Sequence, residues 1–139
     1  MAVVVQDSLV TRTALQLFGQ LGPTPWFVDL FVNLKAPAHG DLLSQYTVCT
    51  LPGYAQVAIN GALWVGGLSG PGIAFYTYPQ ITWNFGGNAG PQQTIYGYIV
   101  HDGTHPLYAE LFPAPFPVPP AGGQLPLVLT WQDEQCLPA

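Results

Sequence analysis

Charge is what this sequence has least of. Only 6% of its 139 residues are Asp, Glu, Lys or Arg, whereas soluble domains carry about a quarter. Two residues alone, Arg12 and Lys35, are Lys or Arg. Nucleic-acid binding needs several such side chains on phosphates, so no nucleic-acid partner is expected. A soluble domain normally keeps charge on its surface, so we expect much of this surface to lie against other protein in an oligomer or a large assembly.

Long apolar runs are also missing. A membrane-spanning helix needs about 20 consecutive apolar residues, and Gly, Pro, Gln or Asn interrupts every run here, so no membrane partner is expected. The first residues lack the pattern of a secretory signal. Cys49 and Cys136 are the only cysteines and have no metal-ligand spacing. We interpret both as free thiols of a protein made in the cytoplasm; a disulfide is the less favoured alternative.

Turns and alternating apolar residues are abundant, most clearly in Ile81–Phe112. Apolar and polar residues alternate along 81–85, as in a strand with one buried face. Residues 94–100 are apolar or aromatic on both faces, which predicts a central strand. Asp102-Gly103 then separates two apolar runs and indicates a hairpin into 107–112. The stretch therefore predicts an antiparallel meander of three strands.

The segment before it predicts a strand and a helical turn. Trp26–Asn33 alternates, with Asp29 and Asn33 on a face that we expect to be partly exposed or in an interface. Asp41 is expected to cap one helical turn over 41–46.

Other signals lie on both sides of the meander. Asn60-Gly61 predicts a second hairpin, which would join 54–60 to 62–65. The Pro-rich segment 113–119 is expected to run as polyproline-like chain over the surface, because proline offers no backbone N–H. Residues 125–131 are expected to form the last strand.

These elements together predict one all-β domain. Roughly seven to nine short strands with regular turns favour a single antiparallel sandwich, jelly-roll-like or Ig-like, with an extended N-terminal arm and a Pro-rich C-terminal segment. Residues 1–20 would form the arm or an edge strand, 21–131 the sandwich and 132–139 a loose tail.

Candidate catalytic residues are few. His101, Asp102 and His105 are the only cluster that resembles a zinc site, but their spacing suits a helix and here falls in a hairpin turn, so ordinary turn roles are favoured. Glu110 with Asp102 is one possible carboxylate pair, and 133–134 holds the other; solvated loop acids explain both. No serine-hydrolase or phosphate-binding motif is present. We expect no enzyme, no metal and no cofactor.

The four tryptophans allow two interpretations. Aromatic rings stack on sugars, so they could line a carbohydrate-binding face. Aromatic residues also dominate domain cores and protein interfaces, and this second interpretation is favoured. The tryptophans are Trp26, Trp64, Trp83 and Trp131.

Three segments also occur together in a recognisable order. ITWNFGG at 81–87 is followed by TIYGYIVHD at 94–102 and by LYAELF at 107–112, with PAPF directly after it. This series resembles a group of small virion structural proteins of tailed bacteriophages, in which a Trp strand and a Gly-rich turn precede an Ile-Tyr-Gly-Tyr strand and a Leu-x-Ala-Glu strand. The resemblance implies a β-rich virion component and transfers no active site.

The leading hypothesis is therefore a non-enzymatic phage virion protein, a capsid decoration or cement protein. It would bind the major capsid protein and copies of itself, as a trimer or dimer, by burying apolar surface across subunit junctions, with extended terminal arms as reinforcement. The alternative is a carbohydrate- or receptor-binding module of a tail fibre or baseplate. The residues expected to anchor the core or an interface are Trp26, Phe27, Phe31, Trp64, Tyr96 and Tyr98.

Overall fold

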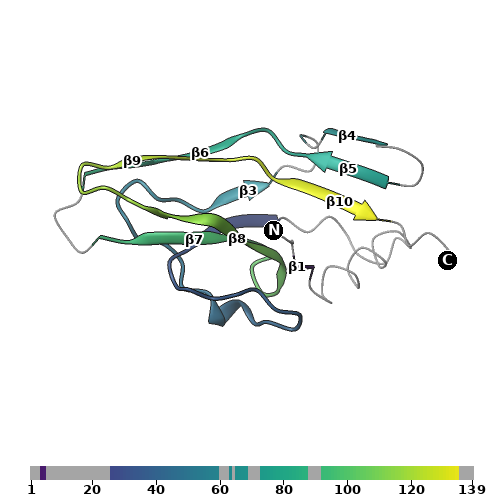
Figure 1. Cartoon of the computed structure of the whole chain (residues 1–139), viewed down its shortest axis with the longest axis horizontal. Coiled ribbons are helices and arrows are strands. Elements are labelled where there is room, and N and C mark those ends of the chain that lie inside the picture. Colours follow the sequence, from purple (N-terminus) through teal and green to yellow (C-terminus); the bar gives the residue numbers. More distant parts are fainter. Residues whose placement is uncertain are drawn as a thin grey trace.

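Two layers of antiparallel β-strands pack face to face in the computed structural model, which describes residues 4–5, 26–59, 63, 65–68, 73–87 and 92–134 (Figure 1). The expected all-β sandwich is therefore confirmed at the level of class. The elements are β1 (Val4–Val5), β2 (Trp26–Phe31), the 3-10 helix η1 (Leu43–Gln45), β3 (Val57–Ile59), β4 (Val65–Leu68), β5 (Ile73–Thr77), β6 (Ile81–Phe85), β7 (Thr94–His101), β8 (Pro106–Pro117), β9 (Gly123–Leu127) and β10 (Thr130–Glu134).

One layer is a five-stranded sheet in the order β1-β8-β7-β2-β3. Its centre is β7, which pairs with β8 on one side and with β2 on the other. The prediction of a central strand at 94–100 is confirmed, because both of its edges and both of its faces are covered. Asp102 and Gly103 lie in the turn between β7 and β8, as the hairpin signal indicated.

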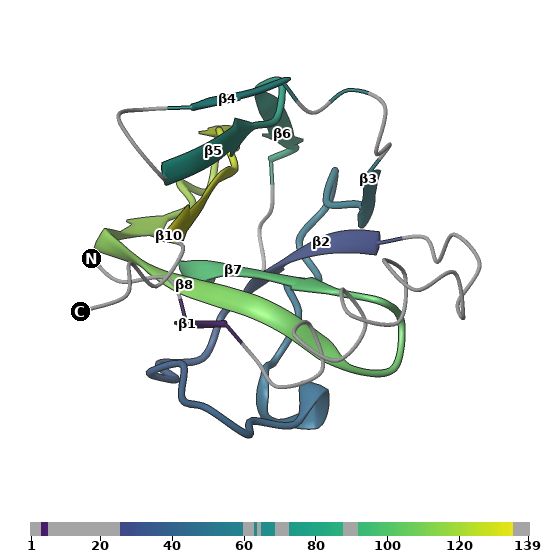
Figure 2. The same cartoon turned by 90° about the vertical axis from the view of Figure 1, so that its right-hand side faces the viewer.

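The other layer consists of two shorter sheets that follow one another along the chain. β6 pairs with β9, and β5 pairs with β10 and β4. The backbone N–H of Tyr78 donates to the carbonyl of Leu129 at 2.9 Å, so the pairing continues across the bend between the two sheets. Figure 2 shows β4, β5 and β6 above the sheet that contains β2, β7 and β8.

The main core fills the space between the layers. Its side chains come from alternate positions, which is how a strand presents one face. On β6 these are Ile81, Trp83 and Phe85, as the alternation predicted. They meet apolar residues of the five-stranded sheet and of β9, among them Val28, Leu30, Ile95, Tyr98, Val100, Leu107, Leu125 and Leu127.

A smaller apolar cluster lies on the opposite face of the five-stranded sheet. It contains Phe31, Tyr46, Ile99 and Ala109, with η1 beside them (Figure 2, the blue segment below the sheet). Gly97 makes room for it, since a Cβ there would lie 2.6 Å from Cζ of Phe31. β7 is therefore covered on both sides of the sheet.

The predicted meander and the predicted second hairpin are wrong. β6 pairs with β9 and not with β7, although it precedes β7 in the chain. β3 pairs with β2, and β4 pairs with β5, so Asn60-Gly61 does not join two paired strands. In both places the strands pair with partners other than those that the local turn signals suggested.

The Pro-rich segment is also not the expected polyproline-like chain, since β8 continues through Pro117. Thr94 pairs with Pro117 and Ile95 with Phe116. The N–H of Val118 donates to the carbonyl of Gln93 at 3.1 Å, so by the alternation of a strand Pro117 directs its backbone away from β7. Proline is tolerated where no backbone N–H is needed, and the register shift opposite 96 accommodates Pro113 and Pro115.

The structure describes part of each end of the chain. β1 pairs with β8, while the rest of the predicted arm, residues 1–3 and 6–20, lies outside the described residues. The expected last strand divides into β9 and β10. β10 reaches Glu134, so the first residues of the expected loose tail belong to a strand, and 135–139 lie outside the described residues.

Candidate functional site

A buried carboxylate and an imidazole meet on the face of the five-stranded sheet that carries the smaller apolar cluster. Asp29 lies in β2 and His101 at the end of β7, and Nε2 of His101 is 2.6 Å from Oδ2 of Asp29. The two residues are only 4% and 3% exposed. The expectation that Asp29 lies on a partly exposed face is therefore wrong, and its partner is 72 residues away in the sequence.

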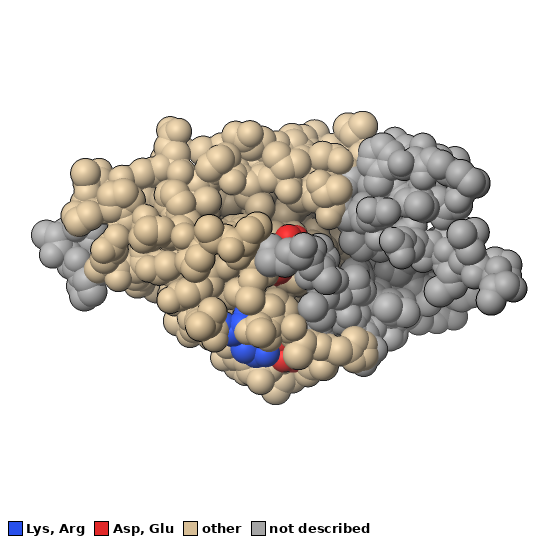
Figure 3. Space-filling view, in the orientation of Figure 1, with Lys and Arg blue, Asp and Glu red and all other residues tan. Residues whose placement is uncertain are grey.

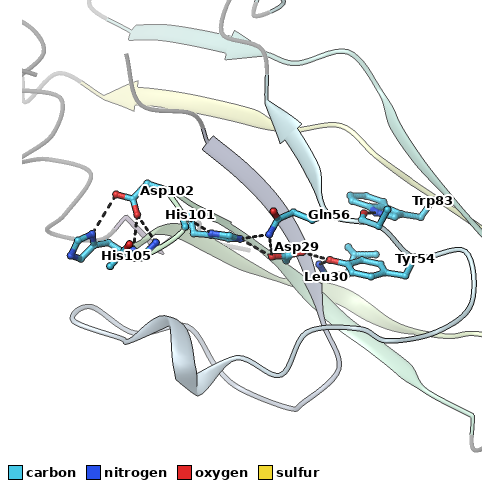
Figure 4. Close-up of polar contacts among 11 residues, drawn as sticks. Asp29, Leu30, Tyr54, Gln56, Trp83, His101, Asp102 and His105 are labelled. Carbon is cyan, nitrogen blue, oxygen red and sulfur yellow. Dashed lines mark hydrogen bonds and ion pairs between the residues drawn. The ribbon is translucent and has the colours of Figure 1, made fainter. Parts of the chain in front are cut away.

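Two further side chains complete this group, which we call the Asp29 network. They come from the segment just before β3, as Figure 4 shows. The Tyr54 hydroxyl donates to Oδ1 of Asp29 and accepts the backbone N–H of Leu30 at 3.1 Å. Gln56 donates its amide to Oδ2 of Asp29 at 2.7 Å. β3 pairs with β2 only as far as Val28, so the backbone N–H of Leu30 has no partner in β3. The Tyr54 hydroxyl accepts that N–H in its place.

The network keeps Asp29 ionised. Burial by itself raises the pKa of a carboxyl group, but the hydrogen bonds from His101, Tyr54 and Gln56 outweigh it and lower the pKa of Asp29 below 3.8. Burial and the neighbouring carboxylate raise the pKa of Tyr54, so its hydroxyl stays protonated and able to donate.

The hydrogen bonds also define the state of His101. The backbone N–H of Gly103 donates to Nδ1 at 3.0 Å, so Nδ1 carries no proton. The neutral ring then has its hydrogen on Nε2, where it faces Asp29. With both nitrogens engaged, His101 has no free acceptor for a substrate proton or a nucleophile. Chemically, the network holds β2, β7 and the 54–56 segment together; its geometry does not match an acid–base dyad.

The predicted His101, Asp102 and His105 cluster does not converge. His101 points to Asp29, whereas His105 is on the opposite side of the turn with Asp102 (Figure 4). Oδ1 of Asp102 accepts the backbone N–H groups of Thr104 at 2.9 Å and His105 at 2.7 Å. This confirms its turn role. In the part of the chain that the structure describes, no three His, Cys, Asp or Glu residues are grouped to hold a metal.

The other candidates are spread through the fold. Glu110 accepts a hydrogen bond from the Tyr98 hydroxyl at 3.0 Å, and the side chains of 133–134 lie outside the description. Of the six predicted anchors, Phe31 and Tyr98 are buried within the chain, while Trp26, Phe27 and Tyr96 are half-buried. Trp64 lies outside the described residues.

The surface that the structure describes carries few charged side chains. Residues 42–100 contain no Asp, Glu, Lys or Arg. Every charged side chain that the structure describes makes a hydrogen bond within the chain; these are Asp29, Lys35, Asp41, Asp102 and Glu110. Figure 3 shows Lys or Arg blue beside Asp or Glu red, with one further red area near the centre of the face and tan over most of the described remainder.

The loop between β2 and η1 contains the clearest example of charged side chains that bind each other within the chain. Lys35 contacts both carboxylate oxygens of Asp41, at 2.9 and 2.8 Å, and the Tyr46 hydroxyl donates to Oδ2 at 2.7 Å. Asp41 was expected to be a helix cap; instead Oε1 of Gln45 accepts the backbone N–H before η1. The ion pair stabilises the loop because Lys35 and Asp41 lie near its two ends.

Two exposed apolar side chains belong to this braced loop. Leu34 and Leu42 are 76% and 64% exposed, on either side of the ion pair. The remaining large apolar residues at the described surface are Leu63, Val65 and Val128. The loop therefore presents apolar groups from a fixed backbone while its charges neutralise each other.

Sequence reasoning did not find the Asp29 network. The available signal was a pair of polar residues, Asp29 and His101, each inside a run of apolar residues that otherwise predicted a covered strand. Such residues are hydrogen-bonded when buried, so each one implies a partner.

Comparisons with known proteins add no assignment. No described helix is long and apolar enough to cross a membrane. Searches against protein-family models, characterised proteins and solved structures found no match to this chain.

Proposed function

We propose that this chain is a non-enzymatic structural protein of a tailed-phage virion, acting as a capsid decoration or cement protein. Its partners would be the major capsid protein and copies of itself, as a trimer or dimer. The proposal includes a jelly-roll-like or Ig-like sandwich and an extended arm over residues 1–20. The phage assignment rests on the resemblance of the strands at 81–87, 94–102 and 107–112.

The observation that supports the assembly role is that every charged side chain the structure describes makes a hydrogen bond within the chain. A described surface with so few charged side chains offers little to keep monomers apart in water. It also lowers the cost of covering that surface with another protein, because few ions must lose their water. Burial of apolar area then contributes about 25 cal/mol per Å2 before the cost of ordering is subtracted.

The loop with Leu34 and Leu42 supports the same role. Two leucines on a braced loop lose less conformational entropy on binding than the same side chains on an unbraced one. Their positions beside the paired Lys35 and Asp41 favour a partner surface that is apolar and weakly charged.

The Asp29 network supports the non-enzymatic part. Its carboxylate accepts hydrogen bonds from three side chains, and both nitrogens of His101 are occupied, so these atoms bind other parts of the fold. A buried polar network that is fully satisfied makes a core more specific and more rigid.

The carbohydrate-binding alternative receives less support. Trp83 is 3% exposed and donates its ring N–H to the carbonyl of Ala55 at 2.8 Å, so it offers no face for stacking on a sugar. The outward positions of β6 and β9 instead carry no aromatic ring, and they include the hydrogen-bonded pair Gln124 and Asn84.

The test is quantitative mass spectrometry of density-purified particles from a lysate that contains this chain. The copy number relative to the major shell protein is the readout. Copies comparable to the shell subunit support a decoration or cement protein. A few copies per particle would move the protein to the tail and favour the alternative, and its absence from particles would refute a virion role.

A further inference from the structure

The outer edge of β8, the side away from β7, is built to accept a short strand. Within the described ranges, Val4 and Val5 of β1 are the residues that pair with it, opposite Ala109 and Tyr108. Among the described residues, no strand continues that pairing toward Phe112. An unpaired edge of this kind is a site for strand addition.

Prolines limit this site at both ends. Pro106 begins β8, and Pro113, Pro115 and Pro117 end it. None of them has a backbone N–H, so none can donate to an added strand. Pairing is confined to residues 107–112, which fits a short strand and excludes a long one.

The chain contains one segment suited to that edge, its own MAVVV sequence. β-Branched residues favour extended structure, and this run carries no charge. The register Val4 to Ala109 already places it there. A second copy carries the same segment and the same edge.

The connection between β1 and β2 does not restrict the strand to its own chain. Residues 6–25 span at most about 70 Å when fully extended. Crossing β8 and β7 to reach β2 requires only about 14 Å, which is three strand spacings. The covalent reach is therefore several times what pairing within one chain needs, so β1 of one copy can reach β8 of a neighbour.

We propose that β1 is an exchangeable strand, and that in the assembled state Val4–Val5 of one copy pairs with the 107–112 edge of β8 in a second copy. This deepens the proposed function and rests on it in one respect, since an assembly supplies neighbouring copies at high local concentration. Exchange adds a β-ladder between copies and needs no free charge.

The test is disulfide trapping in the observed register. Val4→Cys and Ala109→Cys are made in separate chains of different mass, both with Cys136→Ser, and the two purified full-length chains are mixed at high concentration and oxidised. Cys49 is buried and is left in place. Mass spectrometry then measures the peptide that links position 4 of one chain to position 109 of the other.

The matched control pairs Val4→Cys with Thr82→Cys, an exposed position on β6 in the other layer. Exchange predicts a link between 4 and 109 at least about tenfold above this control, because pairing raises the effective concentration of the two thiols. The double variant Val4→Cys/Ala109→Cys in one chain reports pairing within a chain.

Links confined to the double variant would overturn exchange and show that β1 only covers its own edge. Absence of any link between 4 and 109 would overturn the β1 site itself. The measurement contains no particle, so its failure leaves the copy-number test of the virion role unaffected, and the reverse also holds.

Discussion

Three tyrosines allow one experiment that separates a hydroxyl that stabilises the fold from one that does not. Tyr54 donates to Asp29 and accepts the backbone N–H of Leu30. Tyr108 is buried, and among the described residues none offers its hydroxyl a hydrogen-bond partner. Tyr96 is half-buried beside the smaller apolar cluster. Replacing each by Phe removes one oxygen and leaves the ring, so cavity effects stay small.

The expected costs follow from what each substitution leaves behind. Tyr54→Phe strands one oxygen of a buried carboxylate and one buried N–H, and each unsatisfied group costs about 1–3 kcal/mol, so we expect a loss of about 2–5 kcal/mol. Tyr108→Phe removes a hydroxyl that is already unsatisfied, so stability should be unchanged or rise by about 1 kcal/mol. Tyr96→Phe should change it by less than about 0.5 kcal/mol.

Urea unfolding followed by tryptophan fluorescence measures these differences, because Trp83 lies in the core. The midpoint should fall for Tyr54→Phe alone, at a constant slope. A Tyr54→Phe variant as stable as Tyr96→Phe would refute the structural role of the Asp29 network. A clear loss in Tyr108→Phe would show that this hydroxyl has a partner in solution.

Four further substitutions test the turns, Asp29 and the ion pair of the loop. Gly40 and Gly53 share a positive φ, +84° and +85°, but a Cβ at Gly40 meets nothing within 4 Å, whereas one at Gly53 lies 2.2 Å from a carbonyl oxygen of β6. Gly40→Ala should cost about 1–2 kcal/mol and Gly53→Ala clearly more, so equal urea midpoints would contradict this packing. Because the pKa of Asp29 is lowered on folding, its contribution is complete above about pH 4 and is lost as the pH falls through the folded value. Asp29→Asn should therefore be less stable at neutral pH and lose stability less steeply in acid; parallel stability curves would argue against an ionised Asp29. Burial raises the pKa of Asp41, but hydrogen bonds, that from Lys35 foremost, lower this pKa by more than burial raises it. Lys35→Met should therefore raise the pKa of Asp41, as measured by carboxyl NMR titration. An unchanged pKa would mean that the pair is open in solution.

The sequence predicts those features that are local. Alternation identified the buried face of β6, and Asp102-Gly103 identified the β7–β8 turn, because each depends on residues next to one another. It also predicted that 94–100 is central, since a run that is apolar on both faces must be covered on both.

The rest depends on contacts between distant residues. Asn60-Gly61 has good hairpin chemistry, yet β3 and β4 find other partners. Asp29 looked like an exposed polar position because the sequence does not show that His101, Tyr54 and Gln56 meet it. Pro113–Pro117 looked incompatible with a strand because the side of β8 that lacks a donor is defined only by the pairing with β7.

The scarcity of charged side chains at the described surface has a consequence for how this surface responds to its surroundings. Ionic strength weakens attraction between exposed charges, but it has little to act on where such charges are few. Adhesion through Leu34, Leu42 and similar groups is driven near room temperature by the entropy of water, and that driving force declines on cooling. Contacts made by this protein should thus tolerate salt and be sensitive to cold, the opposite of a complex held together by ion pairs.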